Sequence, residues 1–167
     1  VQVEGQKLRS SGPMLITHWG LSGPAILKLS AWGARELAAL NYRFTIRVNW
    51  IVAKTESTRE DLEDLKQEDG RKMVMANSQF GLANRLWKRL VQAAGIREDK
   101  RWADLSKKEI QTLAEELTQG HFQVNGKSTF KEEFVTAGGV DLKEVDFKTF
   151  ESKLFPGLFF AGEVLNI

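Results

Sequence analysis

The sequence contains no cysteine and only two histidines, His18 and His121. Without cysteine there is no disulfide framework, no thiolate nucleophile and no cysteine-based metal site. Two histidines far apart in the chain also argue against a metal centre, because such a centre needs several ligands close together. We therefore predict no metal site.

Long apolar runs and a strong excess of one charge are missing as well. No apolar stretch reaches the about 18 residues that a membrane span needs, and the opening residues VQVEGQKLRSSG lack the apolar region of a signal peptide. The net charge is only +2, which argues against nucleic-acid binding by bulk charge. We expect a cytoplasmic protein with no membrane partner, and we do not favour nucleic acid as a partner.

Apolar residues make up 42% of the 167 positions, enough to form a core. The stretch NYRFTIRVNWIVA alternates apolar and polar residues from Tyr42 to Val52 and predicts a strand with one buried face. The stretch SGPAILKLSAWGARELAAL predicts a helix over about 23–39, with Pro24 at the first helical position and Ser22 or Gly23 as its cap.

Residues 56–119 have the apolar spacing of three amphipathic helices. We expect Thr58 to cap the first helix, Gly95 to end the second, and a capping box of Ser106 and Glu109 to begin the third. Strand patterns lie before and after this stretch.

The order of elements predicts an α+β fold, a mostly antiparallel β-barrel or sheet with an inserted three-helix unit. We divide the chain into a discontinuous β part with one helix (1–55 and 120–155), a helical subdomain (56–119), and the start of a returning strand (156–167).

The octet THWGLSGP places His18 and Ser22 between a strand and a helix. Backbone N–H groups at such a junction can hold an anion or polar ligand, or the octet is only a tight turn with a capping serine. His18 and Ser22 could also be imagined as a base and a nucleophile. The stretch GLSGP resembles the nucleophile motif G-x-S-x-G, but Pro24 stands at the fifth position of the motif, and no acid partner is indicated. Hydrolase chemistry is therefore not favoured.

Two glycine-containing stretches invite a phosphate-binding interpretation. The stretch NGKS at 125–128 lacks the spacing of a phosphate loop, and Asn125-Gly126 favours a hairpin turn instead. The stretch VTAGGV at 135–140 predicts either a turn that needs positive φ or close approach to a flat or phosphorylated ligand.

The chain opens on Val1 and ends on LFFAGEVLNI. The apolar run 158–161 predicts a strand buried on both faces, which would leave a bare hydrophobic edge. Both ends therefore suggest a piece of a longer enzyme. Ligands of α/β proteins lie beyond such strands, although no G-x-G-x-x-G is present.

Several stretches together resemble the BaiN/YhiN-like family of NAD(P)/FAD-dependent flavoproteins. They are THWGLSGP, the helix LANRLWKRLV, VTAGGV, TFESK and GLFFAGEVLN. The resemblance implies an insert domain that forms a lid over a flavin domain of the same parent chain. The parent would use FAD, with NAD(P)H as reductant, to reduce a small unsaturated organic substrate, and the fragment alone would be inactive and would not retain FAD.

The resemblance also implies site residues. Gly162, Glu163 and Asn166 would lie near the ribityl and pyrophosphate groups of FAD, with Asn166 standing where aspartate is common. The loop of His18 and Ser22 would face the cleft between the domains, which makes these two residues the candidates for a catalytic role.

Two alternatives remain open. The helical subdomain could be a nucleic-acid or protein binding module, or the chain could be a structural spacer between the halves of the flavin domain. The cations of the binding module would be Lys88, Arg89, Arg97, Lys100 and Arg101.

Overall fold

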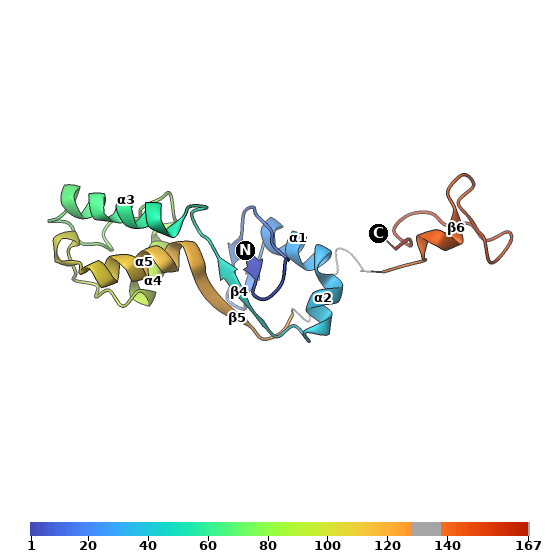
Figure 1. The fold of residues 1–167 in the computed structure, drawn as a ribbon, viewed down its shortest axis with the longest axis horizontal. Helices are drawn as coiled ribbons and strands as arrows, with labels where there is room; N and C mark the ends of the chain where they lie inside the picture. Colours follow the sequence, from blue (N-terminus) through green and yellow to red (C-terminus); the bar gives the residue numbers. More distant parts are fainter. Residues whose placement is uncertain (128–137, 167) are drawn as a thin grey trace. The chain divides into compact units, whose positions relative to one another are not determined.

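The computed structural model describes residues 1–127 and 138–166, which belong to two compact units. The first unit consists of residues 1–11 and 44–124, and the second of residues 12–43 and those from 125 onward. Helices and antiparallel strands occur together, which confirms the α+β class (Figure 1). The strands of the described part form three open sheets and no closed barrel. The division into domains given above stays a prediction.

The sheet of the first unit has β4 (Phe44–Val48) at its centre, between β1 (Gln2–Val3) and β5 (Gly120–Val124). Both pairings are antiparallel. Ile46 and Val48 are buried and Arg47 between them is half-buried, which agrees with the predicted alternation at these positions, whereas Phe44 on the same face is only half-buried. The apolar face of β4 therefore contributes to the core.

The strand is shorter than the sequence predicts, because Asn49 closes a turn directly after Val48. The side-chain oxygen of Asn49 accepts hydrogen bonds from the N–H groups of Ile51 and Ala53, both at 3.3 Å. Asparagine favours such local bonds over the ladder of a sheet. The alternation of apolar residues continues past this point, but the strand does not.

Three helices are inserted between β4 and β5, as predicted: α3 (Thr55–Glu68), α4 (Asn84–Ala93) and α5 (Lys107–Gln119). Figure 1 shows α3 running beside α5. The buried apolar residues of this three-helix unit form one cluster: Leu62, Val74, Met75, Trp87, Leu90, Val91, Ala94, Ile96, Trp102, Leu105, Ile110, Leu113, Ala114 and Leu117.

The ends of these helices agree with the sequence in two cases of three. Ser106 and Glu109 form the predicted capping box at the start of α5. Gly95, with φ of 76°, follows α4 as predicted. Thr58 does not cap α3: it lies inside the helix, buried, and its hydroxyl donates to the carbonyl of Lys54 at 2.9 Å. The pattern Thr-x-x-Asp was misleading because Thr58 hydrogen-bonds back along the helix.

In the second unit, β2 (Leu15–Ile16) and β3 (Leu21–Ser22) form a short antiparallel hairpin. The predicted helix 23–39 is instead two helices, α1 (Pro24–Trp32) and α2 (Ala34–Ala39), separated at Gly33. Glycine is a poor helix former, so its position explains the break. Pro24 occupies the first helical position and Gly23 the cap, as expected.

After the residues that are not described, the chain forms a 3-10 turn, η2 (Leu142–Glu144), and a small antiparallel pair, β6 (Val145–Asp146) and β7 (Glu151–Ser152). Residues 158–161 do not form the predicted strand within this chain. Phe159 is 61% exposed, and among the described residues its pairing is a single bridge to β7.

None of the helices in the described part of the chain is long and apolar enough to cross a membrane. The same residues contain no group of three or more histidine, aspartate and glutamate side chains placed to hold a metal ion. At the predicted hairpin turn, Gly126 does not adopt a positive φ, and the strand expected after it (128–134) lies outside the described residues, as does the first half of VTAGGV.

Candidate functional site

The first candidate site is the hairpin that carries His18. Thr17 closes the turn: its hydroxyl accepts from the N–H of Gly20 at 3.0 Å and donates to the Gly20 carbonyl at 2.9 Å. His18 and Trp19 lie at the tip of this turn, and both side chains are exposed. The sequence therefore folds so that an imidazole is presented on a short, hydrogen-bonded support.

Ser22 does not join His18. It lies on β3 opposite Leu15, and none of the hydrogen bonds among the described residues connects its hydroxyl with the imidazole. Catalytic roles for His18 and Ser22 stay predictions.

The glycine that follows Ser22, Gly23, is required by the local backbone. Its φ is 90°, and a Cβ there would lie 3.0 Å from the backbone nitrogen of Leu15. No other residue fits this position without strain, because side chains disfavour both the angle and the contact. The turn from β3 into α1 is thus fixed by local packing.

The second candidate site is formed by two segments that are separate in the sequence, one around Val140 and one around Leu165. Val140 and Leu165 form a parallel bridge, in which the N–H of Val140 donates to the carbonyl of Val164 at 2.9 Å and the N–H of Asn166 donates to the carbonyl of Val140 at 3.0 Å. Gly139 lies so close that an added Cβ would be 2.4 Å from the Val164 carbonyl oxygen. This glycine therefore serves close approach of the backbone rather than a ligand.

Gly162, Glu163 and Asn166 lie on this pairing and on the turn before it. Gly162 has φ of 79° with open space around it, and Glu163 is exposed. The side-chain oxygen of Asn166 accepts from Arg35 at 2.6 Å. Sequence reasoning missed Arg35, because 131 positions separate the two residues and no motif joins them.

These three residues fit a limited contact to a flavin. The exposed carboxylate of Glu163 is a hydrogen-bond acceptor for hydroxyl groups such as those of a ribityl chain, and the amide N–H groups of Asn166 are donors. The open turn at Gly162 would let a ligand approach the backbone. The sequence has no G-x-G-x-x-G, so a complete dinucleotide site is not expected from this chain.

The stretch TFESK, residues 149–153, has structural contacts of its own. The carboxylate of Glu151 accepts from the N–H of Gly157 at 2.6 Å, and the buried hydroxyl of Ser152 accepts from the N–H groups of Leu154 and Phe155. These bonds close the loop after β7. The contacts of Glu151 and Ser152 are therefore structural.

Comparison with known proteins identifies the domain type. Residues 1–135 match the family described as HI0933-like protein barrel and H2TH domain. The chain belongs to this HI0933-like family. The match supports the flavoprotein-related family to which the resemblance pointed, but it does not support the BaiN branch specifically. Despite the family description, the strands of the described residues form three open sheets and no closed barrel.

Two curated relatives of this HI0933-like chain have the same name. The chain is 31% identical over 157 residues to a ribosomal RNA dihydrouridine synthase of Haemophilus influenzae and 33% identical over 158 residues to one of Escherichia coli. The alignments cover 92% of this chain but only 36% of each relative. The chain thus spans about a third of the length of these relatives.

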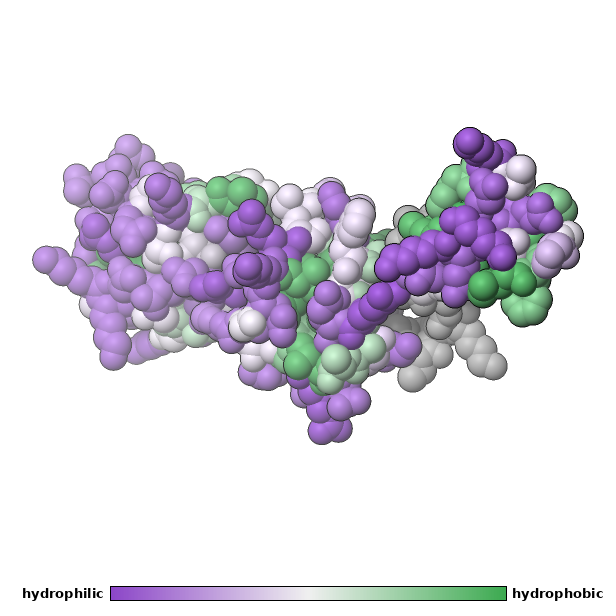
Figure 2. Space-filling view, turned by 45° about the vertical axis from the view of Figure 1, so that its right-hand side comes forward, coloured by the Kyte–Doolittle hydropathy of each residue, from purple (hydrophilic) through white to green (hydrophobic). Residues whose placement is uncertain are grey.

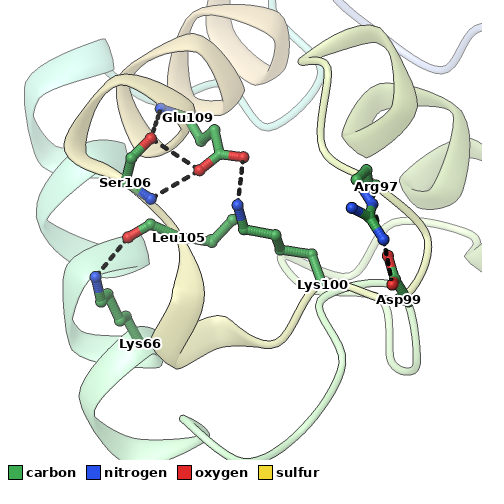
Figure 3. A network of polar contacts seen from close by, with 7 residues as sticks. All are labelled: Lys66, Arg97, Asp99, Lys100, Leu105, Ser106 and Glu109. Atoms are coloured by element: carbon green, nitrogen blue, oxygen red, sulfur yellow. Dashed lines mark hydrogen bonds and ion pairs between the residues drawn. The ribbon is translucent and has the colours of Figure 1, made fainter.

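The cations that could form a binding surface in the HI0933-like domain fall into two groups. Arg97 pairs with Asp99 at 2.6 Å, and Lys100 pairs with Glu109 at 3.0 Å (Figure 3). Arg101, by contrast, is exposed and has no ion pair among the described residues. The remaining predicted cations, Lys88 and Arg89, are exposed on α4.

Glu109 is the centre of the network in Figure 3. It accepts from the backbone N–H and the hydroxyl of Ser106, both at 2.8 Å, and from Lys100. Hydrogen bonding by the Ser106 backbone N–H, then by its hydroxyl and by Lys100, holds the pKa of Glu109 below its usual value, against the opposing effect of desolvation. The network therefore stabilises the start of α5 and neutralises Lys100.

A shallow hollow of about 400 Å³ lies beside the end of α3. Its wall mixes acidic and basic side chains, so it favours no ligand of a single charge. The residues around it are Gln67, Glu68, Asp69, Gly70, Arg71, Lys72, Arg101, Ala103 and Asp104.

Proposed function

We propose that this chain is an accessory domain of a flavin-dependent reductase that acts on uridine in ribosomal RNA. The observation that carries the proposal is the 31% and 33% identity, over 92% of the chain, to two ribosomal RNA dihydrouridine synthases. Dihydrouridine is uridine whose C5–C6 double bond is reduced, so the substrate is an unsaturated organic group, as the resemblance implies. The whole protein would carry out the reaction, and this domain would help to position the cofactor and the substrate.

The cofactor of the whole protein in this proposal is FAD, with NAD(P)H as reductant. A reduced flavin supplies a hydride to a carbon–carbon double bond. Within this chain, Glu163 and Asn166 would hold hydroxyl or phosphate groups of the cofactor, and Gly162 would let it approach the backbone. The exposed turn at 162–164 supports this assignment.

Reduction of a double bond also requires a proton. His18 is the titratable side chain at the tip of the β2–β3 hairpin, where it is exposed. We assign it as the candidate donor to the substrate, with the hairpin as its support. Ser22, half-buried on β3, would position the hairpin rather than touch the substrate.

The partner that covers this domain would be the flavin domain of the same protein. Large apolar side chains are exposed in the segment from 147 to 159, and Figure 2 shows apolar residues at the surface there. Such a concentration favours an interaction surface. The residues concerned are Phe147, Phe150, Leu154, Phe155, Leu158 and Phe159.

The test uses the full-length protein that contains this chain, and the chain alone as its comparison. The full-length protein should bind flavin and, with NADH or NADPH, convert uridine in unmodified ribosomal RNA to dihydrouridine, detected by mass spectrometry of the nucleosides. The chain alone should bind no flavin. Stoichiometric flavin on the chain alone, or a flavin-loaded full-length protein that leaves every uridine intact, would contradict the proposal.

A further inference from the structure

Charge is strongly segregated along the three-helix unit, although the whole chain carries only +2. Residues 70–101 contain eight lysines and arginines against two acidic residues, a net charge of +6. Residues 55–69, which include α3, contain seven acidic residues against two basic ones, a net charge of −5. The small net charge of the whole chain therefore includes a strongly basic segment. A net charge of +2 does not argue against nucleic-acid binding by this segment.

The basic segment places three cations on one face of α4. Arg85, Lys88 and Arg89 are spaced i, i+3 and i+4, so they share a face. All three are exposed, whereas Trp87 and Leu90 on the other side of the helix are buried. We call the surface of Arg85, Lys88 and Arg89 the α4 basic face.

The α4 basic face is not neutralised within the described part of the chain. Among the described residues, no ion pair involves Arg85, Lys88 or Arg89, and the one side-chain hydrogen bond of this face runs from Arg89 to the neutral Gln92 at 3.2 Å. Other cations of the same unit have carboxylate partners, such as Lys100 with Glu109 (Figure 3). Like charges at this spacing destabilise a helix, so folding gives no reason for the arrangement.

The core holds the α4 basic face in place. The buried indole N–H of Trp87 donates to the carbonyl of Val74 at 2.8 Å, and its ring stacks on Trp102 at 6.3 Å between centroids. At the other end of α4, the N–H of Gly95 donates to Gln92 and that of Ile96 to Val91, which fixes the terminus. The cations therefore extend from a rigid support, which lowers the entropic cost of binding.

We propose that the α4 basic face binds backbone phosphates of the ribosomal RNA substrate. This inference rests on the proposed function, since the names of the relatives supply the RNA and the face supplies a complementary charge. Cations on a phosphate backbone give affinity and orientation without reading sequence. The face would hold the RNA while the flavin-bearing part of the protein acts on one uridine.

The test compares the full-length protein with its variant R85Q/K88Q/R89Q. A matched control, K7Q/K28Q/K54Q, removes the same charge from exposed lysines elsewhere. The probe is unmodified ribosomal RNA made by transcription, and its dissociation constant is measured over a range of salt concentrations. We expect the affinity of the α4 variant at low salt to fall at least about tenfold, and its log–log salt slope to fall by about two. The melting temperatures of variant and control should not fall below that of the wild type.

The outcomes separate the two proposals. If dihydrouridine forms and the α4 variant keeps the affinity, salt slope and KM of the control, the RNA surface is refuted and the function stands. If the wild type forms no dihydrouridine but the α4 variant loses RNA affinity, the function is refuted and the surface stands. If the variant loses binding to polyglutamate while RNA affinity is unchanged, the face belongs to an acidic protein partner and the proposal is overturned.

Discussion

At the scale of single residues, tryptophans of the same chain differ widely in burial. Trp87 is fully buried and its indole N–H is satisfied by the carbonyl of Val74, whereas Trp32 is 78% exposed. The sequence places both on helices and does not give the partner of either ring nitrogen. The hydrogen bond of Trp87 depends on a loop that has no periodic pattern.

We predict that Trp87→Phe lowers the free energy of unfolding by about 2–3 kcal/mol, because it leaves the buried Val74 carbonyl without a donor and creates a small cavity. The matched substitution Trp32→Phe should change it by less than about 0.5 kcal/mol. Chemical denaturation of the full-length protein measures both. Equal effects would show that the buried bond contributes nothing.

Glu109 gives a prediction that depends on pH. Because the pKa of Glu109 is lowered in the folded state, the unfolded chain binds the proton more readily. The stabilisation by the network is therefore present above the ordinary value of 4.5 and is lost as the pH falls through the lowered folded pKa. Glu109→Gln keeps an oxygen that accepts from Ser106 but removes the charge beside Lys100, so it should cost about 0.5–1 kcal/mol of unfolding free energy at neutral pH.

The difference between Glu109→Gln and the wild type should shrink as the solution becomes acidic. Glu60→Gln, on the exposed side of α3, is the control and should show little effect at any pH. Denaturation curves collected at several pH values measure these changes. A difference that stays constant down to strongly acidic pH would contradict the role assigned to the carboxylate.

At the scale of elements, periodicity predicted the helices better than the strands. The capping box of α5 and the glycine after α4 are local signals, and the structure has both. The strand expected at 158–161 fails because an apolar run alone does not say whether a neighbouring strand exists to pair with it. The break between α1 and α2 lies at Gly33, which the predicted helix 23–39 included as an interior residue.

The pairing of residues 138–140 with 164–166 is the element that sequence reasoning could least predict. Parallel pairing of distant segments has no local signature, and the glycines of VTAGGV were compatible with either a turn or a ligand. Likewise, the contact of Arg35 with Asn166 depends on tertiary structure alone. The sequence therefore pointed to candidate residues one by one, but it did not show which of them lie together in space.

We predict that Gly139→Ala disrupts this pairing, because its Cβ would overlap the Val164 carbonyl. The N–H groups of Val140 and Asn166 should then lose protection in amide hydrogen exchange, by about tenfold or more. Gly20→Ala is the control, since an added Cβ there meets no atom within 4 Å. Unchanged protection in Gly139→Ala would refute the close approach.

At the scale of the whole molecule, the proposals assign different surfaces to different partners. Exposed apolar side chains between 147 and 159 would face the flavin domain, and the α4 basic face would bind RNA. Composition did not predict the RNA surface, because the net charge of +2 is a sum that includes one segment of +6 and another of −5. Segregation of charge, and not its sum, is the property that bears on a nucleic-acid partner.

The most direct measurement is the dihydrouridine content of ribosomal RNA in cells that lack the full-length gene. The account predicts that deletion removes a dihydrouridine from the RNA, that the intact gene restores it, and that a gene without the segment encoding this chain does not. Ribosomal RNA with the same dihydrouridine content in all of these cells would contradict the account.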